Sequence, residues 1–203
     1  MSTLSTTNVK NASSGSNNIV LAADGSTTIT TLTGTTITGT SVRGAITSGT
    51  VVASTSGTSI DFTSIPSYVK RITVMFDGVS LNGSSVLVVR LGTSGGFATT
   101  GYNTMLGTLT TTNNTTRGLL ATTYFPIQFG GDASHTVAGN IVFTNLTSNT
   151  WTGTGIFVNA VPGNLDSVSG GISLGGALTQ VRITTVSGTD TFDAGSINIL
   201  YEG

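Results

Sequence analysis

Residues 69–91 read VKRITVMFDGVSLNGSSVLVVRL, and this stretch decides the fold class. Its first half alternates apolar and polar residues, the pattern of a strand with one buried face. Asn82-Gly83 follows, a dipeptide typical of hairpin turns. Residues 85–91 are apolar on both faces, as in a central strand. The stretch therefore predicts an antiparallel hairpin whose first strand directs three side chains into a core: Ile72, Val74 and Phe76.

Strand-like segments of this kind recur along the rest of the chain, separated by turn-forming residues. Residues 147–150 join two alternating segments and predict a second hairpin, and on its return strand Ile156, Val158 and Ala160 share one face. About nine or ten antiparallel strands with two faces predict a β-sandwich, of jelly-roll topology at this strand number. The expected strands are 59–62, 69–79, 85–91, 102–109, 119–129 (broken by Pro126), 137–146, 151–161, 168–174, 178–186 and 196–201.

The composition supports an all-β chain and excludes several partners. Only 7% of the 203 residues are charged, against about 25% in a typical soluble protein. The 7 Lys and Arg residues form no basic stripe, so nucleic-acid binding is not expected. No apolar run reaches about 18 residues and the N-terminus has no hydrophobic segment, so we expect neither membrane insertion nor a secretory signal. Such low charge suits a surface covered by other copies or by a larger assembly.

A short repeat precedes the strand-rich part. Residues 31–50 read TLTGTTITGTSVRGAITSGT, with a glycine every five residues. One apolar residue per unit cannot build a globular core, but several copies of the chain can bury these residues mutually. We therefore predict a trimerisation stalk, with a flexible Thr/Gly linker as the alternative. The stalk residues would be Leu32, Gly34, Ile37, Gly39, Val42, Gly44, Ile46 and Gly49.

The chain thus divides into an N-terminal arm (1–30), a Thr/Gly-rich stalk (31–53) and an antiparallel β-sandwich domain (54–203). Residues 1–18 are polar and aperiodic, so we expect them to be disordered unless a partner orders them. Residues 18–30 predict two short strands around a turn at Asp24-Gly25.

A search for reactive groups points away from an enzyme. Residues 171–175 match the letters of a G-x-S-x-G nucleophile elbow, but another strand follows instead of a helix, so Ser173 is expected to be a strand residue. Asp132, Ser134 and His135 are residue types of a catalytic triad, yet they lie too close together in sequence to converge from separate elements. We expect a surface turn there, and no cofactor.

Two binding hypotheses remain. Asp190 and Asp193 could offer carboxylates to a calcium ion, although Asp is also common in turns. Tyr102, Tyr124 and Trp151 are candidate contacts for a host-surface glycan, with structural and core roles as the alternatives.

Two stretches resemble a known family. Residues 55–83 (TSGTSIDFTSIPSYVKRITVMFDGVSLNG) and 179–202 (TQVRITTVSGTDTFDAGSINILYE) are similar to the opening and closing strands of a domain in tailed-bacteriophage virion proteins, often called tail fibre proteins. Residues 18–30 (NIVLAADGSTTIT) also resemble a phage-fibre segment. The resemblance implies a virion structural protein, trimeric in form, and transfers no functional residue.

Together these observations lead to one expectation with an alternative. We expect a non-enzymatic homotrimeric tail fibre on the virion, attached to other virion proteins by its N-terminal arm and presenting the sandwich to a host-surface glycan. The alternative is a capsid decoration or cement protein, a head fibre, whose arm staples capsid subunits together.

Overall fold

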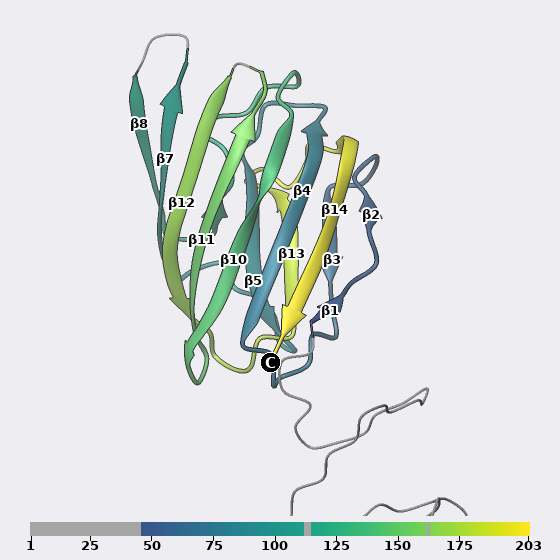
Figure 1. The fold of residues 1–203 in the computed structure, drawn as a ribbon, viewed down its shortest axis with the longest axis vertical. Helices are drawn as coiled ribbons and strands as arrows, with labels where there is room; N and C mark the ends of the chain where they lie inside the picture. The colour runs from purple at the N-terminus through teal and green to yellow at the C-terminus, as the bar shows by residue number, and fades with distance from the viewer. Residues whose placement is uncertain (1–45, 112–114, 162) are drawn as a thin grey trace, which may run out of the picture. The chain divides into compact units, whose positions relative to one another are not determined.

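Figure 1 shows the fold in a computed structural model of the chain. The structure describes residues 46–111, 115–161 and 163–203. The predicted arm therefore lies outside the described residues, as do most of the predicted stalk positions. Those positions are Leu32, Gly34, Ile37, Gly39, Val42 and Gly44.

Within the described residues all the regular structure is β, in two antiparallel sheets. The large sheet runs β1-β14-β4-β10-β11-β12-β7-β8, and β2 also pairs with β14. Its strands are β1 (Thr47–Ser48), β2 (Val52–Ala53), β4 (Arg71–Leu81), β7 (Tyr102–Thr110), β8 (Thr116–Ala121), β10 (Val137–Thr147), β11 (Thr150–Asn159), β12 (Asn164–Ser173) and β14 (Phe192–Glu202). The small sheet runs β3-β13-β5-β6, with β9 also on β5. Its strands are β3 (Ser59–Phe62), β5 (Leu87–Thr93), β6 (Gly96–Phe97), β9 (Phe125–Pro126) and β13 (Gln180–Thr185).

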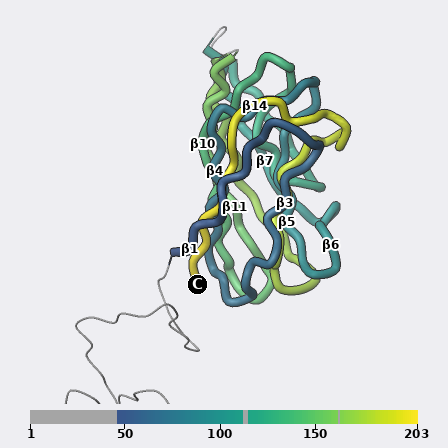
Figure 2. Tube along the Cα trace, turned by 90° about the vertical axis from the view of Figure 1, so that its right-hand side faces the viewer, coloured from purple at the N-terminus to yellow at the C-terminus, as the bar shows by residue number. Residues whose placement is uncertain are grey.

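The two sheets face each other as layers, which Figure 2 shows edge-on. This arrangement confirms the predicted all-β sandwich. The chain pairs in a nested order: β4 with β14, β5 with β13, β7 with β12, and β10 with β11. Nested pairing of early with late strands is the pattern of a jelly-roll-like wrapping, here with one sheet larger than the other.

The predicted hairpin at Asn82-Gly83 is wrong. β4 and β5 lie in different sheets, so the connection between them crosses from one layer to the other. The turn bonds to the 190–191 segment instead of closing on itself: Thr191 N donates to Asn82 Oδ1 at 2.9 Å, and Ser85 N donates to Asp190 Oδ2 at 2.7 Å. A Cβ at Gly83 would collide with the Asp190 carboxyl, so a larger residue there would displace this carboxyl from its hydrogen bond with Ser85 N.

The second predicted hairpin is confirmed. Thr147 pairs with Thr150 at the turn between β10 and β11. Asn145 stabilises this turn, because its Nδ2 donates to the carbonyl oxygens of Ser148 at 2.9 Å and Thr150 at 3.2 Å. Ser148 adopts a left-handed φ of 46° at the tip.

The core fills the space between the sheets. The predicted inward residues of β4 are buried there, and aromatic rings from both layers meet edge to face. Phe125 lies 5.0 Å from Phe143 and 5.6 Å from Tyr102, centroid to centroid. Gly153 on β11 provides the room for this cluster, since a Cβ there would lie 2.8 Å from atoms of Phe125 and Phe143. The buried residues of β4 are Ile72, Val74 and Phe76.

Residues 46–53 lie along the last strand. β1 and β2 both pair with β14, and Gly49 N donates to Ile199 O at 2.8 Å. A Cβ on Gly49 would lie 2.6 Å from Ile199 Cγ2, so this glycine allows a close backbone approach within one chain. The described end of the predicted stalk therefore extends the large sheet.

Candidate interaction surface

The residues that matched catalytic patterns occupy structural positions. Ser173 ends β12, and its hydroxyl lies 2.8 Å from Thr150 Oγ1 across the sheet. Asp132 Oδ1 accepts from both the backbone N (2.9 Å) and the Oγ (2.7 Å) of Ser134, which is the expected surface turn. These hydrogen bonds hold the pKa of Asp132 below its usual range.

The two aspartates considered for calcium are engaged by nearby donors. Asp190 accepts the Ser85 amide, and Asp193 accepts a hydrogen bond from the Ser80 hydroxyl. Within the described ranges no group of three or more acidic or histidine side chains is placed to hold a metal ion. Asp190 thus fixes the connection between the two sheets, whereas Asp193 joins β14 to β4 within the large sheet.

Two of the three candidate glycan contacts are buried. Tyr102 and Trp151 are each 3% exposed, so neither ring offers a face to a sugar, and a core role replaces the glycan hypothesis for them. The Tyr102 hydroxyl accepts from Leu91 N at 2.9 Å and lies 3.2 Å from Ala98 O. Tyr124 is half-buried, with its backbone carbonyl accepting from Thr104 Oγ1 at 2.7 Å.

A different surface stands out, the solvent side of the large sheet, which we call the outer face. Six large apolar side chains from β7, β8, β11 and β12 are exposed on this face, and the exposed fraction of each residue lies between 44% and 68%. We call them the outer apolar group: Met105, Leu109, Leu120, Ile156, Val158 and Leu165. Val158, Leu165 and Leu109 are direct neighbours across three strands, and Met105 lies opposite Leu120.

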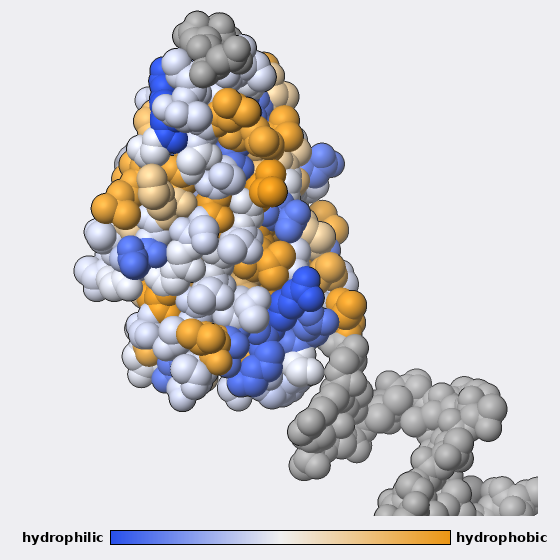
Figure 3. Space-filling model, turned by 60° about the vertical axis from the view of Figure 1, so that its left-hand side comes forward, coloured by the Kyte–Doolittle hydropathy of each residue, from blue (hydrophilic) through white to orange (hydrophobic). Residues whose placement is uncertain are grey.

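The group arises from strands that are apolar on both faces. On β11, Trp151 and Phe157 point into the core, so Ile156 and Val158 must point outward. The sequence showed that these two residues share a face but not which face it is. Figure 3 brings the β7–β8 side forward and shows apolar side chains exposed among pale Ser, Thr and Gly residues.

The outer face carries no charge over β7, β8, β10, β11 and β12 in the part of the chain that the structure describes. Arg117 and Asp166 are the charged residues of these strands, and both lie on the inner side. Arg117 stacks 5.5 Å from the Phe129 ring centroid, and Asp166 is fully buried. By contrast, the small sheet exposes a bidentate ion pair between Arg182 and Asp61, with N–O distances of 2.8 and 2.7 Å.

Beneath the outer face lies a buried polar cluster. Asp166 accepts a hydrogen bond from Thr108 Oγ1 on the neighbouring strand, and burial raises the pKa of its carboxyl. Asp166 Oδ2 and both amide atoms of Asn159 find no hydrogen-bond partner among the described protein atoms. Such groups cost about 1–3 kcal/mol each when buried without a partner. These side chains lie on the inner side of β11 and β12, under the outer face.

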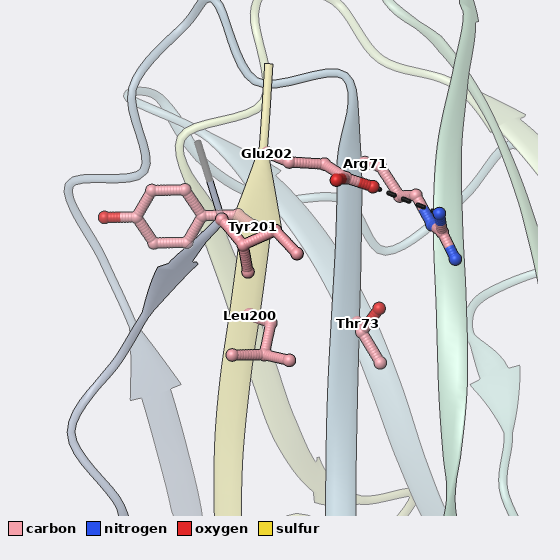
Figure 4. A pocket seen from close by; sticks show the side chains of 6 residues that line it. Arg71, Thr73, Leu200, Tyr201 and Glu202 are labelled. Carbon is pink, nitrogen blue, oxygen red and sulfur yellow. Dashed lines mark hydrogen bonds and ion pairs between the residues drawn. The ribbon is translucent and has the colours of Figure 1, made fainter. Parts of the chain in front are cut away.

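A shallow pocket of about 160 Å³ lies at the end of the large sheet where the described chain begins. Figure 4 shows Arg71 paired with Glu202 at its rim (3.1 Å), beside Thr73 and Leu200. Ile46, 67% exposed, also lines it. Pockets for drug-sized ligands usually measure about 300–1,000 Å³, so this hollow is too small for that role.

The comparisons add no family. Protein-family models, curated proteins and solved structures were searched, and none matched. Among the described residues no helix is long and apolar enough to cross a membrane. The outer face is therefore the feature of the structure from which a function must be argued.

Proposed function

We propose that this chain is a non-enzymatic structural protein of a bacteriophage virion. In this proposal it is a homotrimeric tail fibre, joined to the particle by residues 1–30, held together by residues 31–53, and adhering to the host surface through the sandwich. The observation that carries it is the part of the outer face over β7, β8, β10, β11 and β12, which exposes apolar side chains and no charge. A surface of this kind suits contact with another surface better than solvation.

The two ends of the described chain support a fibre geometry. Ile46, where the description begins, lines the same pocket as Tyr201 and Glu202 at the C-terminus. Figure 1 shows β1 and the C-terminus at one end of the sandwich. An attachment that enters at this end leaves the opposite end free to meet a host surface.

The same features suit a capsid decoration protein, because an arm ordered by its partner can staple capsid subunits. Immunogold labelling of purified particles tests the proposal directly. Label on the tail is the expected result, whereas label on the head would favour decoration. Particles without label would contradict a virion role altogether.

Adhesion and catalysis are separated by two further measurements. Binding of the purified chain to an array of host glycans is expected if the sandwich is an adhesin. Incubation with host polysaccharide is expected to release no oligosaccharides, and release would contradict the non-enzymatic assignment.

A further inference from the structure

We infer that the outer face of the large sheet is an interface between copies of this chain. The occupant of the face is thus another copy of this chain, and around a three-fold axis the outer apolar groups of neighbouring copies meet one another. The inference deepens the proposed function, and rests on it only in treating this face as a contact surface. The interface would exist in the purified chain whatever particle the protein belongs to.

The chemistry of the face favours a protein partner without charge. Interface cores are depleted of charged residues and enriched in apolar ones, and interfaces between identical subunits are the most apolar. The outer apolar group consists of Leu, Ile, Val and Met side chains, flanked by Thr, Ser, Asn and Gly from the same strands. An identical copy supplies a surface of matching character.

Other occupants fit less well. A sugar is commonly held by aromatic rings, yet the rings on these strands, Tyr102, Phe143, Trp151 and Phe157, are all buried on the inner side. A nucleic acid needs basic residues, and the one basic residue of these strands, Arg117, is stacked on Phe129. An ionic protein partner would find no opposite charge on β7, β10, β11 or β12 of the described face.

The area is sufficient for a stable contact. At about 4.8 Å between strands and about 3.3 Å per residue, strands β10, β11, β12, β7 and β8 cover roughly 550 Å² of face over seven residues. Adding β4 and β14 raises this to roughly 780 Å², close to the about 800 Å² that each partner buries in a standard interface. Arg71, Asp77 and Glu202 then fall at one side of the face, where a polar rim is expected.

The absence of cysteine from the chain makes the proximity test simple. Leu165→Cys places one thiol in the middle of the Val158–Leu165–Leu109 row. A short bis-maleimide reagent should join two copies of this full-length variant, giving a covalent dimer on a denaturing gel. Val186→Cys is the matched control, since Val186 is also exposed (43%) but follows β13 of the small sheet. Equal cross-linking at both positions, or none at residue 165, overturns the inference.

An energetic test completes the proximity test. The double variant Ile156→Lys/Leu165→Lys puts two like charges on each copy's face and should raise the dissociation concentration of the oligomer at least about tenfold, as expected for central interface residues. Both side chains are exposed, at 61% and 44%, so the fold should survive, and an unchanged thermal transition confirms this. Unchanged dissociation, or a monomeric wild-type chain, overturns the interface without touching the immunogold test of the virion role.

Discussion

Tyr102 offers the sharpest test of the packing, because its hydroxyl joins the two sheets. The side chain projects inward from β7 of the large sheet, and its oxygen accepts from Leu91 N on β5 of the small sheet at 2.9 Å. On that edge of β5, β9 pairs with Val88 and Val89, and β6 pairs with Gly92 and Thr93. The Tyr102 hydroxyl therefore fills the gap between two short partner strands.

Tyr102→Phe removes the hydroxyl and keeps the ring. Leu91 is completely buried, so its N–H would lose its partner where water cannot replace it. An unsatisfied buried group costs about 1–3 kcal/mol. For a chain of this size that corresponds to a fall in Tm of about 2–12 °C.

The assay is urea unfolding followed by the fluorescence of Trp151, with Tyr68→Phe as the control. Tyr68 is 64% exposed, so its loss should change the free energy of unfolding by no more than about 0.5 kcal/mol. Equal stability of the Tyr102→Phe variant and wild type would refute the bridging role. Glycan binding, if the chain shows any, should be unchanged because the ring is buried.

Alkaline titration gives a second measurement on the same residue. Burial raises the pKa of Tyr102 from 10.0 to about 12. The folded state therefore holds this proton more tightly than the unfolded chain, and the stability it contributes is present below pH 10 and lost as pH rises towards 12. The loss amounts to about 3 kcal/mol. The Tyr102→Phe variant lacks this contribution, so the difference between its free energy of unfolding and that of wild type should become smaller above pH 10.

Three further predictions follow from other parts of the molecule. Gly153→Ala should destabilise the fold by about 1–3 kcal/mol, because the added Cβ crowds Phe125 and Phe143. Gly107→Ala is the control and should have little effect, since a Cβ there meets nothing closer than Ser167 Oγ at 3.6 Å. Equal urea midpoints of the two variants would contradict this prediction. Burial raises the pKa of Asp166 in the folded state, so the folded state holds the carboxyl proton more tightly than the unfolded chain does. The free energy of unfolding should therefore fall as pH rises from about 4. Asp166→Asn should reduce the difference in the free energy of unfolding between pH 4 and pH 7, measured from unfolding curves at both pH values. An unchanged difference would count against this prediction. Removal of residues 31–45, which spares β1 and β2, should raise the dissociation concentration of the oligomer in analytical ultracentrifugation; no change would contradict a stalk.

How far the sequence predicts the structure depends on the range of the interactions. The β10–β11 hairpin was predictable because its turn is stabilised locally, by Asn145 on residues 148 and 150. The hairpin at Asn82-Gly83 was not, because the group that fixes this turn is Asp190, 105 residues from its partner Ser85. The dipeptide Asn82-Gly83 therefore lies in a connection between the two sheets, where a distant carboxylate binds the turn.

The candidate site shows the same limit for a different reason. β11 is apolar on both sides, so alternation alone cannot say whether Ile156 or Phe157 faces the core. The packing of the core decides it: the Phe157 ring meets the Phe76 ring of β4 edge to face, with 5.5 Å between the ring centroids. The sequence makes Tyr102 and Trp151 candidates for a surface site, because an aromatic ring with a polar atom can lie either at the surface or in the core. Only their packing reveals a core role.

The nested strand pairing also governs when the protein can fold. Arg71 and Glu202 pair across β4 and β14 although 131 residues separate them along the chain. Closing so long a loop is slow, and topologies dominated by distant pairs fold on millisecond-to-second timescales. β4 cannot complete its sheet until the eleven residues of β14 have left the ribosome. The complete sandwich, and any assembly that depends on it, therefore forms only after β14 has been synthesised, and a chain cut short before Phe192 would leave the edge of β4 open to aggregation.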